Sequence, residues 1–229
     1  MVEMNSQQSR IREAYDLTVE QYHKGIDPLE SVPEEIKSLP GYEEVINNVS
    51  LGSSAADIKE YLKPEKGMHF LDAGCCANLA NYRFDKWPCT YYGVDISPAM
   101  IEAMKTFALK NGISIGGLHN TDIANMPFDD DFFQIAALIG VLEYCTLEYS
   151  KRALREMRRV LQPGAKMVLD IPNLDHPYVE TMFRLEEHLR RPHIPKGREA
   201  LENLLAPMFR IEHADDSRVM LKYFVRAEK

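Results

Sequence analysis

The feature that most constrains the fold is a regular alternation of short apolar runs with helical stretches. Runs of strand length occupy residues 68–74, 90–97, 114–121, 132–141 and 165–172, and helical patterns lie between them at 78–87, 98–112 and 151–161. Strands that alternate with helices at these lengths form a parallel sheet with helices on both faces. The expected fold class is therefore α/β, with a Rossmann-like, doubly wound and mostly parallel sheet.

The last part of the chain follows a different pattern. Residues 209–227 contain two β-rich runs separated by Asp215, Asp216 and Ser217, which is typical of an antiparallel hairpin. The hairpin brings the expected sheet to seven strands and reverses the last of them. Between the parallel strands and the hairpin, residues 174–206 predict helices that form a lid over one face.

The first part of the chain is predicted to be helical. Residues 6–24 carry apolar side chains at helical spacing, and prolines at positions 28, 33 and 40 then interrupt the pattern. Ser53 or Ser54 can cap a further helix that ends before Pro64. These patterns predict a helical region ahead of the sheet.

The length of 229 residues leaves room for one α/β domain and a modest appendage. Apolar residues make up 45% of the chain, enough for a buried core. The expected organisation is an N-terminal helical cap of residues 1–50 and a ligand-binding sheet domain of residues 51–229, into which the lid of residues 174–206 is inserted.

The charge of the chain bears on its partners. The formal charge is −8, whereas proteins that bind a phosphate backbone usually present a basic face, so nucleic acid is disfavoured. The longest apolar stretch, residues 135–142, is far too short for a bilayer, and the first ten residues lack the apolar core of a secretory signal. We expect a soluble, cytoplasmic protein that does not bind membranes. The sequence does not indicate an oligomeric state.

Four cysteines occupy positions 75, 76, 89 and 145 without CxxC spacing. This arrangement predicts neither a metal site nor a disulfide framework. The adjacent pair Cys75 and Cys76 allows two interpretations. The pair could fill space otherwise taken by glycine, which we favour, or it could form a redox or metalloid-handling site at the start of a helix.

A glycine turn and a later acid mark the first candidate binding site. Ligands of open parallel sheets bind where the strands end. Gly74 ends the first predicted strand, and the absence of a side chain allows a sharp turn and the close approach of a ligand. Asp95 ends the second strand, 21 residues later, where a carboxylate can accept hydrogen bonds from both ribose hydroxyls of an adenosyl group. Asp95 could instead cap the following helix, alone or with Ser97.

A third element distinguishes between nucleotide cofactors, because nicotinamide-dependent dehydrogenases share the strand, the glycine and the acid. Here the third strand leads into Asp122 and Ile123. An aspartate beside an apolar side chain can bind an adenine amino group while the apolar side chain covers the ring.

Together these motifs resemble class I S-adenosylmethionine-dependent methyltransferases. The sequence looks closest to the branch that contains small-molecule methyltransferases of ubiquinone and menaquinone biosynthesis. The resemblance covers residues 50–175 and rests on four segments in order: LDAGCCANLA, YYGVDIS, TDIANMPFDDDFF and RVLQPGAKMVLDIPN. It implies a transferase that uses S-adenosylmethionine, releases S-adenosylhomocysteine and methylates a small molecule.

The resemblance also implies roles for individual residues. The cofactor-binding set is Asp72, Ala73, Gly74, Cys75, Asp95, Ile96, Asp122, Ile123, Leu138, Ile139, Tyr15 and Tyr22. The first loop would line the methionine part, Asp95 would hold the ribose, and Ile96, Asp122 and Ile123 would surround the adenine. The residues that end the fourth strand would form a floor beneath the sulfonium. The two tyrosines would close over the cofactor, or they would belong to a helix face packed on the core.

The first loop departs from the family pattern acid-x-Gly-x-Gly-x-Gly, because Cys76 and Asn78 replace the second and third glycines. Asparagine tolerates a left-handed backbone, so Asn78 can occupy its position. Cys76 carries a Cβ, which costs about 1 kcal/mol if its φ is positive. The departure bears on the affinity for the cofactor rather than on the fold.

Candidates for a general base follow the fourth strand. Methyl transfer from a sulfonium is an in-line displacement, for which the protein mainly aligns the reactants and excludes water. A base is needed only when the acceptor retains its proton, and Glu143 and Tyr144 are the catalytic candidates. Both residues could instead form a polar start to the next helix.

Residues 183–199 carry an unusual number of basic side chains for an acidic protein, namely Arg184, Arg190, Arg191, Lys196 and Arg198. They could bind a carboxylate or phosphate of an anionic substrate, because the guanidinium fork suits these groups. Alternatively, the segment is a solvated helix with charge pairs at spacing i,i+4, the interpretation that we favour.

Three functions remain open from the sequence. The leading hypothesis is an active small-molecule methyltransferase. The second is a non-catalytic protein that binds S-adenosylmethionine or S-adenosylhomocysteine, which the altered glycine loop would suit. The third is a nucleotide-dependent oxidoreductase, which the sequence disfavours because only Gly74 remains of a Gly-x-Gly-x-x-Gly loop.

Overall fold

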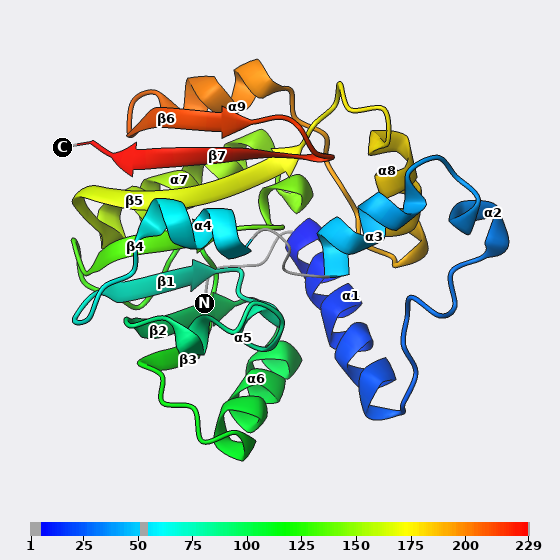
Figure 1. Cartoon of the computed structure of the whole chain (residues 1–229), viewed down its shortest axis with the longest axis horizontal. Coiled ribbons are helices and arrows are strands. Elements are labelled where there is room, and N and C mark those ends of the chain that lie inside the picture. The colour runs from blue at the N-terminus through cyan, green and yellow to red at the C-terminus, as the bar shows by residue number, and fades with distance from the viewer. Residues whose placement is uncertain (1–5, 51–54, 229) are drawn as a thin grey trace.

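A computed structural model describes residues 6–50 and 55–228. Within these residues, seven strands form one sheet in the order β3-β2-β1-β4-β5-β7-β6 (Figure 1). The strands are β1 (His69–Ala73), β2 (Thr90–Asp95), β3 (Gly117–Asn120), β4 (Phe133–Leu138), β5 (Leu161–Pro172), β6 (Phe209–Asp215) and β7 (Met220–Ala227). Strands β1 to β5 pair in parallel, and β7 is antiparallel to both β5 and β6. The predicted α/β sheet with its antiparallel hairpin is confirmed.

Helices lie on both faces of this sheet. They are α1 (Ser6–His23), α2 (Glu34–Lys37), α3 (Tyr42–Ser50), α4 (Ala55–Leu62), α5 (Asn78–Asn81), α6 (Pro98–Lys110), α7 (Leu147–Val160), α8 (Val179–His188) and α9 (Arg198–Leu205), with short 3₁₀ turns at Phe84–Lys86 and Leu142–Tyr144. Side chains of α7 and α9 share one apolar cluster with the sheet, and side chains of α4, α5 and α6 share a second cluster on the opposite face.

Strand β4 shows why the apolar run of residues 132–141 is continuous. Successive side chains of a strand point to opposite faces. Ala136 and Leu138 therefore lie in the cluster under α7, whereas Ile135 and Ala137 lie in the cluster under α4 and α6. A strand buried on both faces needs apolar side chains at consecutive positions.

The second cluster contains a group of packed aromatic rings. Trp87, the only tryptophan of the chain, is 6% exposed. Its ring lies 5.1 Å from that of Phe70 on β1 and 4.7 Å from that of Phe84. These rings anchor the segment between α5 and β2 to the sheet.

Several boundaries differ from the sequence prediction. The helix expected at 78–87 is broken, because Arg83 adopts a left-handed φ of 53° between α5 and the 3₁₀ turn. Helix α7 begins at Leu147, since the Thr146 side chain accepts a hydrogen bond from the Tyr149 backbone N–H. Strand β5 begins at Leu161 and runs through Pro163 and Gly164, which were expected to end the helix.

Other helix ends agree with the prediction, and some elements were not predicted. The Ser97 side chain caps α6 by accepting a 3.0 Å hydrogen bond from the Met100 backbone N–H. The proline-containing region holds α2, and α3 follows it. The proposed caps Ser53 and Ser54 lie outside the described residues.

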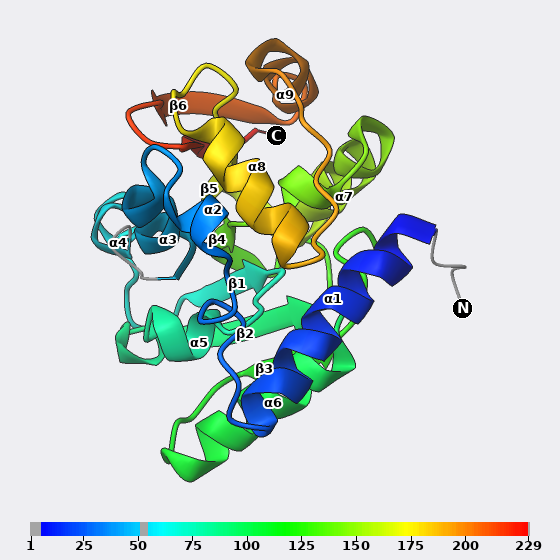
Figure 2. The ribbon, with the colours of Figure 1, turned by 90° about the vertical axis from the view of Figure 1, so that its right-hand side faces the viewer.

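The N-terminal helices cover the carboxyl ends of the parallel strands. Helix α1 packs along α6, and α2 and α3 pack against α8 (Figure 2). Val32, Val45 and Leu185 form part of a small apolar cluster at this second contact. Among the described residues, no helix has both the length and the apolar character that a membrane span requires.

Candidate active site

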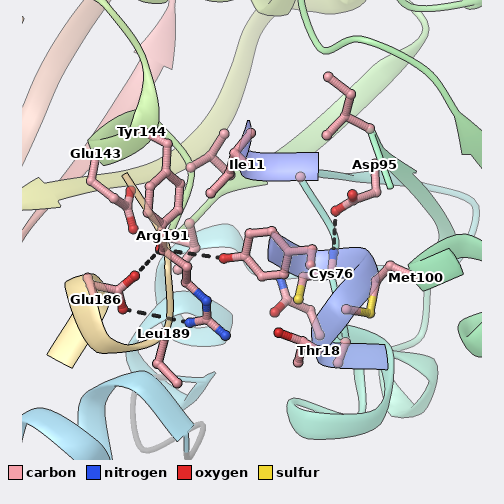
Figure 3. A pocket seen from close by; sticks show the side chains of 18 of the residues that line it. Ile11, Thr18, Cys76, Asp95, Met100, Glu143, Tyr144, Glu186, Leu189 and Arg191 are labelled. Carbon is pink, nitrogen blue, oxygen red and sulfur yellow. Dashed lines mark hydrogen bonds and ion pairs between the residues drawn. The ribbon is translucent and has the colours of Figure 1, made fainter. Parts of the chain in front are cut away.

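A cavity of about 540 Å³ opens at the carboxyl ends of the central strands (Figure 3). Its lining includes Gly74 after β1, Asp95 at the end of β2, Ile139 after β4 and Asp170 near the end of β5, and α1 provides the opposite wall. Strand order reverses between β1 and β4, which is where ligands of open α/β sheets bind. The size of the cavity suits a small-molecule ligand.

The loop after β1 is shaped by backbone contacts with β2. Gly74 has a φ of 72°, and the backbone N–H groups of Gly74 and Cys75 both donate to the Val94 carbonyl, at 2.9 and 2.8 Å. Cys76 has a φ of 40°, so it adopts the left-handed conformation considered for this position. Asn78 does not: it begins α5, and its side-chain amide donates to Asp72 Oδ1 at 3.2 Å. The strain expected at Cys76 is therefore present, and the left-handed role considered for Asn78 was wrong.

Replacing Gly74 with alanine should destabilise the protein by about 2 kcal/mol, through left-handed strain and overpacking. A Cβ at Gly74 would lie 2.3 Å from Val141 Cγ2. The double variant G74A/V141A should recover the overpacking part of the loss while keeping the strain. Urea unfolding of the wild type, G74A, V141A and the double variant measures both parts, and a G74A variant as stable as the wild type would contradict the geometry.

Asp95 lines the cavity and is 7% exposed. Its Oδ2 accepts a hydrogen bond from the Cys76 backbone N–H and its Oδ1 accepts one from the Ser97 N–H, each at 2.8 Å. Ser97, not Asp95, caps α6. An ionised carboxylate has about four acceptor positions, so Asp95 can still accept two hydrogen bonds from a ligand.

Four of the predicted cofactor residues lie behind the cavity wall. Asp72, Ala73, Cys75 and Leu138 are completely buried, and they are not among the residues that line the cavity. Asp72 Oδ2 accepts a 2.8 Å hydrogen bond from the Tyr91 hydroxyl. Burial raises the pKa of Asp72 to about 7, although the hydrogen bonds from Tyr91 and Asn78 oppose this shift. Asp72 therefore supports the loop from below.

Ile96 and Ile123, which were expected to surround the adenine, line the cavity, and so does Ile139, which was expected to form the floor beneath the sulfonium. Asp122 does not line the cavity. The Asp122 carboxylate accepts hydrogen bonds from Gln8 Nε2 at 3.0 Å, from the Ala124 N–H at 2.8 Å and from the Tyr149 hydroxyl. It thereby joins α1 to α7 beside the cavity.

Both N-terminal tyrosines line the cavity. The Tyr15 hydroxyl lies 3.5 Å from the Tyr144 hydroxyl. Tyr22 is more exposed, and its hydroxyl donates to Asp27 Oδ1 at 3.4 Å. Tyr15 is thus a wall residue in the interior, whereas Tyr22 lies nearer the solvent.

The catalytic candidates lie at the opposite end from Asp95. Glu143 is 6% exposed, it lines the cavity, and its Oε2 has no hydrogen-bond partner. Burial, and secondarily the charge of Asp170, raises the pKa of Glu143 well above its usual value. The Tyr144 hydroxyl donates to Glu186 Oε2 at 2.8 Å. Both candidates belong to the 3₁₀ turn ahead of the Thr146 cap, so they do not start α7.

Glu186 lines the cavity although the sequence did not indicate it, and Arg191 lines it although the favoured interpretation placed it on a solvated helix. The favoured interpretation of the basic segment is correct for Arg184 and Arg198, which form i,i+4 pairs with glutamates. It is wrong for Arg191 and Lys196, whose side chains are mostly buried. The Lys196 ammonium donates to the backbone carbonyls of Leu142 and Ile194. The unusual number of arginines in residues 183–199 was the sequence feature that could have indicated this part of the cavity.

Within the described residues, no group of three or more histidine, cysteine, aspartate or glutamate side chains could hold a metal ion. The Cys76 thiol lines the cavity, and burial raises its pKa to about 12. A thiol with a raised pKa is a poor nucleophile. The geometry therefore does not favour the redox interpretation of the cysteine pair.

Comparisons with known proteins point to one family. Residues 71–169 match the model of a methyltransferase domain family. A ubiquinone biosynthesis O-methyltransferase of Coxiella burnetii is 25% identical over 143 residues, which cover 62% of this chain and 59% of that enzyme. The chain thus spans less than two thirds of the length of this relative.

Solved structures share the fold at low identity. The [4+2]-cyclase SpnF superposes with a TM-score of 0.62 at 17% identity, covering 76% of this chain and 80% of that chain. Geranyl diphosphate C-methyltransferase from Streptomyces coelicolor A3(2), solved with S-adenosylhomocysteine, superposes with a TM-score of 0.61 at 13% identity, covering 77% and 78%. Residues 71–169 thus match a methyltransferase domain, and the sheet shares its fold with a solved methyltransferase, which supports the predicted resemblance to class I S-adenosylmethionine-dependent methyltransferases.

Proposed function

We propose that this protein transfers a methyl group from S-adenosylmethionine to a small molecule bound in the same cavity. The observation that carries the proposal is that one cavity joins Asp95 and the loop after β1 to Glu143 and Tyr144. The match to a methyltransferase domain family supports methyl transfer. The neighbour solved with S-adenosylhomocysteine supports the cofactor.

The residues of the cavity fit this cofactor. Asp95 retains the acceptor positions that a ribose requires, and Ile96 and Ile123 offer an apolar surface to an adenine ring. Gly74 exposes backbone where the methionine part would lie, and Tyr15 lies across the cavity on α1. When bound, S-adenosylmethionine supplies an activated methyl group on a sulfonium.

Helix α1 covers part of the cavity in which the reacting groups would meet. Gln7 Nε2 donates to the Tyr144 carbonyl at 2.7 Å, and the Ser97 hydroxyl donates to Asp16 Oδ1 at 2.5 Å. With the contact from Gln8 to Asp122, these hydrogen bonds hold α1 over both ends of the cavity. A covered cavity favours in-line transfer, because it restricts the direction of approach and limits the access of competing water.

Glu143 is the proposed base for an acceptor that must lose a proton. Its unpartnered Oε2 can accept a hydrogen bond from a hydroxyl or amine in the cavity. A base is most effective when its pKa lies near the working pH, and burial moves the pKa of Glu143 in that direction. Tyr144 would orient the acceptor beside it.

Glu143→Gln should lower kcat for a hydroxyl acceptor by about 100-fold, a typical contribution of a general base. Because the pKa of Glu143 is raised, its basic form is lost as the pH falls through that pKa. Wild-type kcat should therefore decrease toward acid pH, and the variant should lack this decrease. The measurement is a pH profile of S-adenosylhomocysteine release, with an acceptor found by screening phenols and other hydroxyl compounds.

Glu148→Gln provides the matched control, because Glu148 is exposed on α7 nearby. It should behave as the wild type. If Glu143→Gln kept the wild-type rate and pH profile, the assignment of the base would fail.

Calorimetric titration with S-adenosylmethionine and S-adenosylhomocysteine tests the function itself, and micromolar binding of both is expected. Binding without methylation of any compound in a broad screen would support the non-catalytic alternative. Binding of reduced nicotinamide in place of S-adenosylmethionine would support the oxidoreductase and overturn the proposal.

A further inference from the structure

Arg191 is the only arginine or lysine among the described residues that line the cavity. It lies three residues after the end of α8, and its side chain is 13% exposed. Figure 3 shows the guanidinium between Glu186 and the side of the cavity where Cys76 and Thr18 lie. A fixed positive charge therefore stands between the two ends of the cavity.

The contacts of Arg191 leave hydrogen-bond donors available. Arg191 Nη1 lies 3.7 Å from Glu186 Oε1, which is too long for a hydrogen bond, and Arg191 Nε has no partner. Arg191 Cζ lies 4.8 Å from the centre of the Tyr15 ring, a cation–π contact. The guanidinium therefore retains a buried, unpaired N–H donor, and its fork can bind a carboxylate through two parallel hydrogen bonds.

The remaining charges of the cavity are negative. Asp95, Glu143, Asp170 and Glu186 all line it. A ligand that brings an anionic group into this cavity has Arg191 as its one fixed cation among the described lining residues. Burying an anion without a cation is unfavourable, so the anionic group must lie against Arg191.

The loop after β1 lies within the electrostatic reach of Arg191. Burial raises the pKa of the Cys76 thiol, and the charge of Arg191 opposes that shift. Residues 74–78 of the loop contain no basic side chain. The part of the cofactor assigned to this loop, the methionine, carries a carboxylate that needs a cation.

We propose that Arg191 binds the carboxylate of the methionine part of the cofactor. The proposal rests on the proposed function and adds that the segment after α8 belongs to the cofactor site as well as to the lid. On cofactor binding, Arg191 would then exchange its long contact with Glu186 for a bidentate contact with the cofactor carboxylate. The lid and α1, whose Tyr15 ring supports Arg191, would close over the cofactor together.

The test compares two ligands that differ in the amino-acid group that bears the carboxylate. S-adenosylhomocysteine contains the amino-acid group, whereas 5′-methylthioadenosine shares the adenosine and the thioether but lacks it. Calorimetry on Arg191→Met should show about 30-fold weaker binding of S-adenosylhomocysteine, the loss expected for a charged hydrogen-bonded pair. Binding of 5′-methylthioadenosine should change by less than about twofold, because it makes no contact with a carboxylate-binding group. Arg191→Lys should be intermediate for S-adenosylhomocysteine.

Two further variants separate this role from a structural one. Arg184→Met removes an exposed arginine of the same lid, so both affinities should remain unchanged. Arg191→Met alone leaves the buried carboxylate of Glu186 without its cation. The double variant R191M/E186Q removes that carboxylate as well, and it should still lose affinity for S-adenosylhomocysteine but not for 5′-methylthioadenosine. Retained binding of 5′-methylthioadenosine shows in each case that the cavity is intact.

Each other outcome overturns a stated part of the argument. Unchanged binding of S-adenosylhomocysteine to Arg191→Met, or equal losses for both ligands in the single and double variants, would overturn the role of Arg191 and leave the proposed function standing. Failure of the folded wild type to bind either ligand would overturn the proposed function and this inference with it.

Discussion

Replacing Asp95 with alanine should weaken the binding of S-adenosylhomocysteine by at least about 150-fold, because it removes two charge-assisted hydrogen bonds to the ribose hydroxyls and each contributes about 1.5–3 kcal/mol. The variant also removes the carboxylate that holds the backbone N–H groups of Cys76 and Ser97, so the loop after β1 loses one of its anchors. The direct and indirect effects act in the same direction. We therefore expect this to be the largest loss of affinity from a single substitution.

Calorimetric titration measures the loss, and thermal unfolding shows whether the variant is folded. Asp95→Asn retains one acceptor oxygen and should give an intermediate affinity. Asp129→Ala removes an exposed carboxylate from the loop ahead of β4 and should bind as the wild type does. Wild-type affinity in a folded Asp95→Ala protein would contradict the assignment of the ribose site.

The free energy of unfolding of the wild type should change with pH more than that of Asp72→Asn does. Between pH 5 and pH 8 the two changes should differ by about 3 kcal/mol. The pKa of Asp72 is about 7 in the folded protein because the carboxyl is completely buried, whereas an unfolded aspartate has a pKa of about 3.9. The folded state thus holds the proton more tightly. The contribution of Asp72 to stability is complete below about pH 4 and is lost as the pH rises toward 7.

Asparagine has nearly the shape of the protonated carboxyl and does not ionise. The variant should therefore resemble the wild type most closely in acid and become progressively more stable than it as the pH rises. Urea unfolding at intervals from pH 5 to pH 8 gives the difference curve. A difference that stayed constant with pH would show that Asp72 does not titrate in this range, and Asp129→Asn should follow the wild type throughout.

The fold could be predicted from the sequence because its determinants are local. The apolar run of β4 indicates a strand that is buried on both faces. Ser97 followed by Pro98 indicates the start of α6. The break at Arg83 could not be predicted, since no glycine or proline stands there to signal a left-handed residue. The early start of α7 depends on a single capping side chain, Thr146, in an otherwise polar stretch.

The candidate site was predictable only in part, because a motif indicates where a strand ends but not how deep a side chain lies. Asp72 and Asp95 both end strands, yet Asp72 lies behind the cavity wall and Asp95 lines it. Arg191 and Glu186 reach the cavity through the packing of α8 against α2 and α3, a long-range contact. Their place in the site therefore needs the tertiary structure.

The aromatic group around Trp87 has a practical consequence for solution studies. Because the chain contains one tryptophan, its tryptophan fluorescence has a single source. That source is packed against Phe70 and Phe84 and is not part of the cavity lining. Its emission spectrum should therefore report the loss of packing on that face of the sheet during the urea titrations. A ligand in the cavity should leave the spectrum almost unchanged, so unfolding can be followed optically with the ligand present.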